Sequence, residues 1–115
     1  MATNKHTTRE KTTNTFYFNL LANGSYIDLS TVHHVEMHMM DKQKTTYRYS
    51  SLDSSPAVAI FDATEGKVSF TPPSETTFLY VRSPYRIYWQ VWETSSKKYS
   101  VPEDVYFEIE ILQEY

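Results

Sequence analysis

The segment from Val105 to Leu112 constrains the fold of this chain more than any other. Its apolar residues alternate with tyrosine and glutamate, in the order Val105, Tyr106, Phe107, Glu108, Ile109, Glu110, Ile111. A side-chain period of two is that of a β-strand with one buried face and one wet face, whereas a helix repeats about every 3.6 residues. The sequence therefore predicts a strand here, with the odd-numbered residues turned toward a second layer of sheet.

Similar alternation recurs along the chain, and turn residues separate the segments that carry it. The predicted strands are 15–21, 32–40, 45–51, 67–71, 85–93 and the closing segment, with shorter extended pieces at 26–29 and 58–60. For Ser74 to Tyr80 the residues leave one helical turn and an irregular crossing equally open. About seven short strands with a turn roughly every ten residues, and no convincing amphipathic helix, predict an all-β fold. We expect an immunoglobulin-like antiparallel β-sandwich.

The length of 115 residues corresponds to one domain with a single core. Residues 1–14 are rich in threonine, lysine and asparagine and carry almost no apolar side chains. Such a segment buries too little surface to order itself. The sequence thus predicts a flexible polar N-terminal arm over residues 1–14 and the sandwich domain over residues 15–115.

Composition excludes several classes of protein. The chain has no cysteine, which excludes disulfides, thiolate nucleophiles and cysteine-bound metals, and favours folding in a reducing cytosol. It has no apolar run near the roughly 20 residues that cross a bilayer, and its first residues lack the apolar segment of a secretory signal. A net charge of −3 offers no concentrated positive field. We expect neither nucleic acid nor membrane as a partner.

Four motifs, in their order along the chain, resemble a known family. They are Ile27-Asp28-Leu29-Ser30, the segment from Asp62 to Pro73 (DATEGKVSFTPP), Tyr85 at the start of a strand, and the closing Phe107-Glu108-Ile109-Glu110-Ile111. Their order resembles the phage baseplate upper protein N-terminal domain family, over most of the chain from about Thr15 to Leu112. The most specific part is the hairpin segment from aspartate to proline.

The resemblance implies a structural protein of a bacteriophage virion, assembled in the cytoplasm of the bacterial host. It implies an immunoglobulin-like domain used for attachment within a tail, baseplate, collar or fibre, without catalytic residues or cofactors. The partners that it implies are other phage structural proteins and further copies of the chain itself.

Three aromatic residues are candidates for the interface. By strand parity Tyr88, Trp92 and Tyr106 face outward, where flat rings anchor a protein partner or stack on a sugar. Large exposed rings on a small sheet protein typically mark association surfaces, so subunit contact is favoured over a glycan. Trp89 has the opposite parity and is expected in the core.

One group of residues has the chemistry of a metal site. His34, Glu36 and His38 alternate along a predicted strand, so that their side chains leave one face about 7 Å apart. The competing interpretation is a solvated or intersubunit polar face, and it is favoured because zinc sites usually draw ligands from several elements. His33 is expected to point the other way. Met37 and Met39 are expected to fill the core.

Motifs of known enzyme classes are absent from the sequence. There is no nucleophile elbow and no glycine-rich phosphate loop, and no recognisable motif ties the paired acids Glu108 and Glu110 to a partner. The sequence therefore predicts a protein that is not an enzyme. A host-surface module that binds a glycan is the alternative function, and a bacterial immunoglobulin-like adhesion domain is a weaker third one, disfavoured by the missing signal and cysteines.

Overall fold

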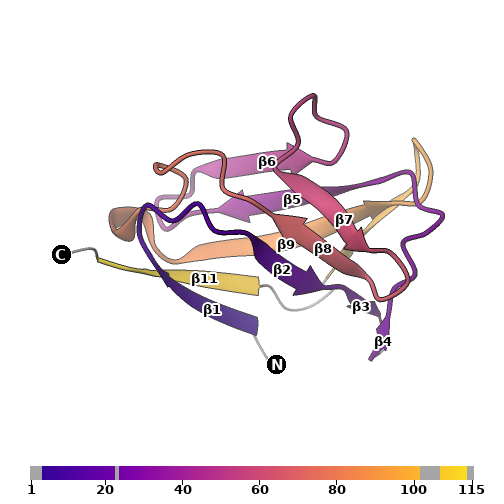
Figure 1. The fold of residues 1–115 in the computed structure, drawn as a ribbon, viewed down its shortest axis with the longest axis horizontal. Helices are drawn as coiled ribbons and strands as arrows, with labels where there is room; N and C mark the ends of the chain where they lie inside the picture. The colour runs from indigo at the N-terminus through magenta and orange to yellow at the C-terminus, as the bar shows by residue number, and fades with distance from the viewer. Residues whose placement is uncertain (1–3, 23, 102–106, 114–115) are drawn as a thin grey trace.

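The computed structural model describes residues 4–22, 24–101 and 107–113. These residues form eleven strands and one short 3-10 helix, so the prediction of an all-β fold is confirmed (Figure 1). The elements are β1 (Asn4–Arg9), β2 (Phe16–Asn19), β3 (Leu21–Ala22), β4 (Ser25–Tyr26), β5 (His34–Met40), β6 (Thr46–Ser50), β7 (Val58–Asp62), β8 (Lys67–Phe70), η1 (Tyr80–Arg82), β9 (Tyr85–Trp92), β10 (Lys98–Val101) and β11 (Phe107–Leu112). None of the described residues belongs to a helix long and apolar enough to cross a bilayer.

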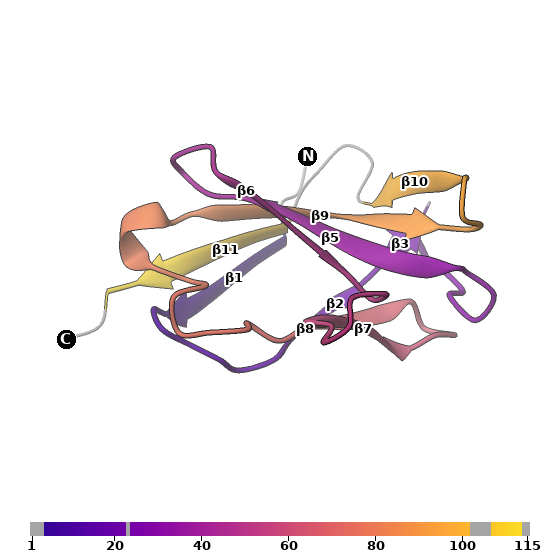
Figure 2. The same cartoon turned by 90° about the horizontal axis from the view of Figure 1, so that it is seen from above.

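The strands form open sheets. The larger sheet has the order β1-β11-β9-β5-β6, and β10 also pairs with β9. A second sheet has the order β2-β8-β7, and β3 and β4 form a separate small hairpin. All described pairs are antiparallel except β1 and β11, which run parallel. Figure 2 shows the larger sheet lying over the β2-β8-β7 sheet, and the two layers enclose the core.

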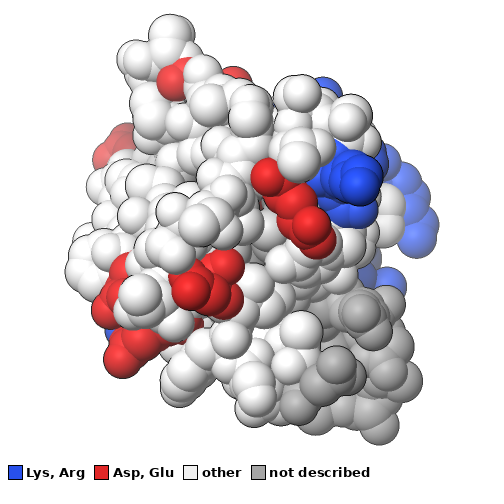
Figure 3. Space-filling view, turned by 90° about the vertical axis from the view of Figure 1, so that its right-hand side faces the viewer, with Lys and Arg blue, Asp and Glu red and all other residues white. Residues whose placement is uncertain are grey.

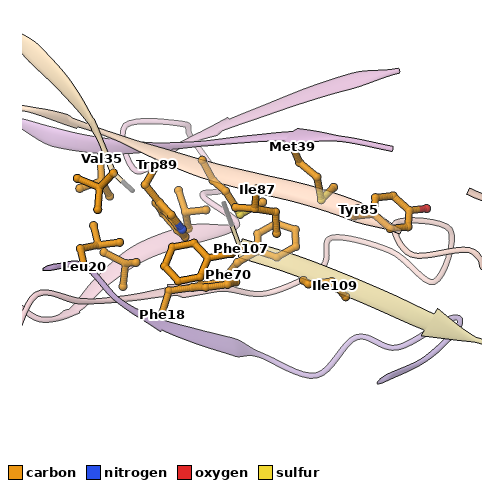
Figure 4. Close-up of a cluster of buried hydrophobic side chains, with 14 of the residues drawn as sticks. Phe18, Leu20, Val35, Met39, Phe70, Tyr85, Ile87, Trp89, Phe107 and Ile109 are labelled. Atoms are coloured by element: carbon orange, nitrogen blue, oxygen red, sulfur yellow. The ribbon is translucent and has the colours of Figure 1, made fainter. Parts of the chain in front are cut away.

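Large side chains from both layers meet between the sheets (Figure 4). The Phe18 ring of β2 lies 5.6 Å from that of Trp89 in β9 and 5.0 Å from that of Phe107 in β11, measured between centroids. Trp89 is fully buried, and so are Met37 and Met39 within 2%. These three predictions for core residues are confirmed. Packing of apolar surface across the two layers is what stabilises such a fold.

The closing strand has the predicted parity. Phe107, Ile109 and Ile111 are buried with at most 5% of their surface exposed, while Glu108 and Glu110 are half-buried on the other face. Val105 and Tyr106, which begin the predicted strand, lie outside the described residues. The alternation of apolar and polar residues was therefore a correct signal over the part of this strand that the structure describes.

Gly66, in the turn between β7 and β8, lies directly against the backbone of a neighbouring segment of the chain. Its φ is +62°, and a Cβ atom there would lie 2.7 Å from the carbonyl oxygens of both Leu20 and Ile27. The Gly66 carbonyl accepts a hydrogen bond from the Leu20 N–H at 2.8 Å. Only glycine combines this left-handed conformation with so close an approach of two backbones. The turn thus ties the β7–β8 hairpin to the chain between β2 and β4.

The N-terminal segment differs from its prediction. Asn4–Arg9 is strand β1, which pairs in parallel with Phe107–Leu112 of β11. The His6 ring also contacts the Phe18 ring at a centroid distance of 5.6 Å. Backbone hydrogen bonds to an open strand edge supply what the polar side chains cannot, and composition does not reveal such an edge. The expectation of a free arm is therefore corrected for residues 4–9.

Two other differences are local. About seven strands were predicted, and the additional ones are β1, the short β3–β4 hairpin and β10, which is separate from β11. The segment from Ser74 to Tyr80, for which two alternatives were open, is an irregular crossing up to Leu79, with a turn closed by the bond from the Thr77 N–H to the Ser74 carbonyl, 3.2 Å. Its last residue, Tyr80, begins the 3-10 helix η1.

Candidate functional site

The predicted site residues lie on the outer face of β5, β6 and β9, the face turned away from the core. Antiparallel pairing of β5 with β9 places Trp92 opposite His34, Gln90 opposite Glu36 and Tyr88 opposite His38. Pairing of β5 with β6 places Arg48 opposite His38. We use the term outer face for the set His34, Glu36, His38, Arg48, Tyr88, Gln90 and Trp92. Because side chains alternate along a strand, the residues between them point into the core.

The Glu36 carboxylate lies at the centre of the outer face. Its Oε2 lies 3.2 Å from Nη2 of Arg48 and 3.4 Å from Nε2 of His34, and its Oε1 lies 3.3 Å from Nε2 of His38. Nε2 of His38 also lies 3.1 Å from Oε1 of Gln90. The sequence predicted that His34, Glu36 and His38 share one face, and the structure brings them into contact.

The same residues are less exposed than a solvated face requires. Glu36 and His34 expose only 5% and 8% of their surface. The Trp92 ring stacks on the His34 ring at a centroid distance of 5.2 Å and an angle of 14°. Side chains from the neighbouring strands thus cover Glu36 and His34. The expectation of a solvated face is corrected for these two residues. His33 also contacts this group, because its Nδ1 lies 2.7 Å from Nδ1 of His34.

Neighbouring residues stabilise the ionised form of the Glu36 carboxyl. Burial alone would raise the pKa of this carboxyl, but the Arg48 guanidinium lowers it, and hydrogen bonds from His38 and His34 lower it further. The buried indole N–H of Trp92 falls short of hydrogen-bond geometry and adds a smaller contribution in the same direction. The pKa of Glu36 is therefore below its usual value, and the group is an anion at neutral pH.

The arrangement around Glu36 is a network of one ion pair, with Arg48, and two histidine contacts. Among the residues that the structure describes, no group of three histidine, cysteine, aspartate or glutamate side chains is arranged to hold a metal ion. Arg48 already contacts the Glu36 carboxylate that a metal ion would need as a ligand. A metal ion bound there would be repelled by the positive charge of the guanidinium. His34, Glu36 and His38 meet as predicted, but the contacts between them do not favour a metal.

The predicted interface aromatics differ in accessibility. Tyr88 is 41% exposed, and one face of its ring stacks on His38 at 4.9 Å and 6°. Trp92 is half-buried, with His34 on the β5 side and Nζ of Lys98 4.8 Å from its ring centroid on the β10 side. Because these two strands flank β9 on opposite sides, both faces of the Trp92 ring are covered. Tyr106 lies outside the described residues.

Two hollows border the outer face. A polar one of about 560 Å³ is lined by residues that include Glu36, Arg48, Gln90 and Lys98. A mainly apolar one of about 420 Å³ is lined by residues that include Met40, Thr46, Arg86 and Tyr88. His38 borders both. The face therefore offers fixed donors and acceptors on one side of the His38–Tyr88 pair and apolar surface on the other.

Sequence reasoning missed three members of this site. Arg48, Gln90 and Lys98 were not singled out, although Arg48 and Gln90 both contact the residues that were. The signal that places Arg48 is the pairing of the predicted strands 32–40 and 45–51 through the short turn between them. The contact of Gln90 with His38 requires the pairing of β5 with β9; the two residues are 52 positions apart in the chain, and no local pattern gives that register.

Large apolar side chains are also exposed elsewhere. Among the described residues, the exposed ones are Tyr17, Leu21, Tyr26, Leu52, Phe61, Tyr80, Val81, Tyr88 and Leu112. Leu21 and Tyr26 face each other on the β3–β4 hairpin, and η1 carries Tyr80 and Val81 near the opposite end of the molecule (Figure 1). On the end seen in Figure 3, basic and acidic groups both occur and neither sign covers the face. Apolar area rather than charge is the common feature of these surfaces.

Comparison with family models and with curated proteins gave no relative from which a function can be transferred. No model of a known protein family matches the chain, and no curated protein matches it significantly.

Proposed function

We propose that the protein is a non-enzymatic structural component of a bacteriophage virion that acts through protein–protein assembly in a tail, baseplate, collar or fibre. The single observation that carries the proposal is the set of large apolar side chains left exposed, most of them on strands. Monomeric proteins rarely leave contiguous apolar area uncovered, and such area marks association surfaces. The assignment to a phage rests on the resemblance of the sequence motifs.

An immunoglobulin-like sandwich is the architecture that we infer. The order β2-β8-β7 in one sheet and β11-β9-β5-β6 in the other corresponds to the strand orders B-E-D and G-F-C-C′ of that fold. Tyr85 at the start of β9 supports the same inference, because its hydroxyl accepts a hydrogen bond from the Leu79 N–H at 3.0 Å. A tyrosine at this corner that bonds to the backbone a few residues upstream is a hallmark of the fold.

Rigidity of the outer face supports assembly as the function. Tyr88 is exposed, yet its ring is fixed by stacking on His38, which Glu36 and Gln90 hold in turn. A side chain that is already ordered loses little entropy when a partner covers it. Exposed tyrosines of this kind are typical anchors of protein interfaces.

The proposal is tested on particles of the phage that encodes the chain. Mass spectrometry of purified virions is expected to detect the chain, and imaging with a specific label is expected to place it at one structural position. Particles carrying Tyr88→Ala are expected to contain less of it, while Tyr88→Phe, which keeps the ring, serves as the matched control. Absence of the wild-type chain from purified virions would contradict the proposal.

Recognition of a host glycan is the second candidate function. It is favoured by one observation, which is that His38 borders both the polar hollow with Arg48 and Gln90 and the apolar hollow that the exposed Tyr88 lines. A ring face beside side chains that donate and accept hydrogen bonds suits a sugar. A glycan array probed with wild-type protein and Gln90→Ala separates the two candidates. Binding that the variant loses supports the glycan, and an empty array removes it.

A further inference from the structure

Strand β1 is attached to the molecule mainly through its backbone. It lies at the end of the larger sheet, where β11 is its only strand neighbour among the described residues. Of its described side chains, none is fully buried: His6 and Thr8 are half-buried and Thr7 and Arg9 are exposed. Hydrophobic burial, which holds the other strands of this sheet, therefore contributes little to the position of β1.

The surface beneath β1 nevertheless requires a cover. Without β1, the outer edge of β11 would present a row of unpaired backbone groups. His6, whose ring contacts those of Phe16 and Phe18, would leave that side of the core open as well. Any process that removes β1 is thus favourable only if another strand of the same kind takes its place.

The turn that follows β1 has the properties of a hinge. Lys11 has a φ of +64°, a left-handed conformation that is unfavourable for a residue with a side chain. Its N–H donates to the Phe78 carbonyl at 3.0 Å, which fixes the turn in this conformation. Residues 11–15 are Lys-Thr-Thr-Asn-Thr and connect β1 to β2 without glycine or proline. An extended path through this segment would relieve the strained φ.

From these three features we propose that β1 is exchanged between copies, so that β1 of one molecule pairs with β11 of another. Because the exchanged β1 has the same sequence and register as the original, the edge of β11 is covered in both copies. The exchange therefore requires no contact that the single molecule does not already make. This inference deepens the proposed function by naming a second copy of the chain as the partner. It rests on the strand geometry and holds for the purified protein whether or not a virion contains it.

Disulfide trapping between two single-cysteine variants tests the exchange. Thr7 lies beside Glu110 in the β1–β11 register, and the chain has no cysteine of its own. Full-length Thr7→Cys and Glu110→Cys are mixed at high concentration, incubated and oxidised. We expect a disulfide-linked heterodimer that increases with protein concentration. The control pair is Thr7→Cys with Ser69→Cys, a position on β8 that is not beside β1. Equal heterodimer yields from both pairs, or none from either, would overturn the proposal.

Two lysine variants test the hinge. Lys11→Gly accommodates the positive φ and is expected to lower the exchanged fraction about fivefold, because it removes the strain that favours opening. Lys44 has a φ of +70° in the turn after β5 and provides the matched control. Lys44→Gly is expected to leave the exchanged fraction unchanged. Equal effects of the two variants would refute the hinge. Virion incorporation is a separate measurement, so failure of the exchange and failure of the proposed function are distinguishable.

Discussion

Two buried carboxylates, five residues apart, have different roles in this molecule. Glu36 lies in the middle of β5 and Asp41 directly follows that strand, and they expose 5% and 3% of their surface. Oδ1 of Asp41 accepts from the N–H groups of Gln43 and Thr45, at 2.9 and 3.0 Å. Its Oδ2 accepts from the Tyr47 hydroxyl and from Nη1 of Arg82, both at 2.9 Å. The Glu36 carboxylate, in contrast, contacts the side chains of His34, His38 and Arg48. These three residues line the polar hollow together with Glu36.

The difference teaches how to separate a structural carboxylate from one at a candidate site. Asp41 satisfies backbone donors of its own turn and links that turn to Arg82 of η1, so its hydrogen bonds determine the path of the chain. Glu36 determines no backbone path, and instead it orders His34, His38 and Arg48 on the outer face. Burial of the charge therefore indicates strong interactions for both Asp41 and Glu36. Only the identity of the partners distinguishes a structural carboxylate from one at a candidate site.

Removal of the Asp41 carboxylate is expected to have the largest effect on stability. Asp41→Ala leaves the N–H groups of Gln43 and Thr45, the Tyr47 hydroxyl and the Arg82 guanidinium without the buried carboxylate that accepts from them, and we expect a loss of about 3 kcal/mol in the free energy of unfolding. Chemical denaturation measures it. Asp41→Asn keeps one acceptor oxygen and is expected to lose less. A loss below that of the matching Glu36 substitution would reverse the assignment of roles.

Removal of the Glu36 carboxylate is expected to cost less stability and to disturb the outer face more. Arg48 is 66% exposed and is solvated by water without its partner, so we expect Glu36→Ala to lose about 2 kcal/mol. The histidine NMR signals of His34 and His38 are expected to shift in this variant and to stay unchanged in folded Asp41→Asn. Glu36→Gln, of nearly equal volume, controls for packing. Unchanged histidine signals in Glu36→Ala would contradict the network.

Acid is expected to weaken the protein through the same two groups. Burial raises the pKa of Asp41, but the Arg82 hydrogen bond, the Thr45 N–H, Tyr47 and the Gln43 N–H lower it below its ordinary value of 3.8. A carboxyl with a depressed pKa stabilises the fold fully above its unfolded-state pKa, and this contribution is lost as the pH falls through the folded-state pKa. Denaturation between pH 7 and pH 2 should show the decline of stability beginning near pH 4. Asp41→Asn should decline less steeply, and an equal slope would refute the contribution of Asp41.

The sequence predicted those parts of the fold that depend on local periodicity. The parity of β5, β9 and β11 follows from alternate residues, and the buried set Met37, Trp89 and Ile109 agrees with it. The position of β1 was not predictable in this way, because Asn4–Arg9 has no apolar period and is held by the edge of a strand some 100 residues later. Non-local backbone pairing leaves no mark on the composition of the segment that uses it.

The candidate site was predictable to a similar extent. Alternation placed His34, Glu36 and His38 on one face, and it placed Tyr88 and Trp92 on the corresponding face of another strand. It did not predict that Trp92 would be covered by His34 and Lys98, because that depends on the register of three strands. The burial of Glu36 was missed for the same reason, since Arg48 reaches it from β6.

The smallest effect that still separates the two carboxylates comes from single hydroxyl groups. The Tyr47 hydroxyl donates to Asp41, so Tyr47→Phe is expected to lose about 1 kcal/mol of stability. Tyr88 adjoins Glu36 only through the ring of His38, and within the described residues its hydroxyl has no hydrogen-bond partner. Tyr88→Phe is therefore expected to leave stability unchanged. Thermal unfolding of the two variants side by side measures the difference. Equal losses would mean that the outer face stabilises the fold as directly as the Asp41 turn does, and the distinction between a structural carboxylate and a site carboxylate would then fail.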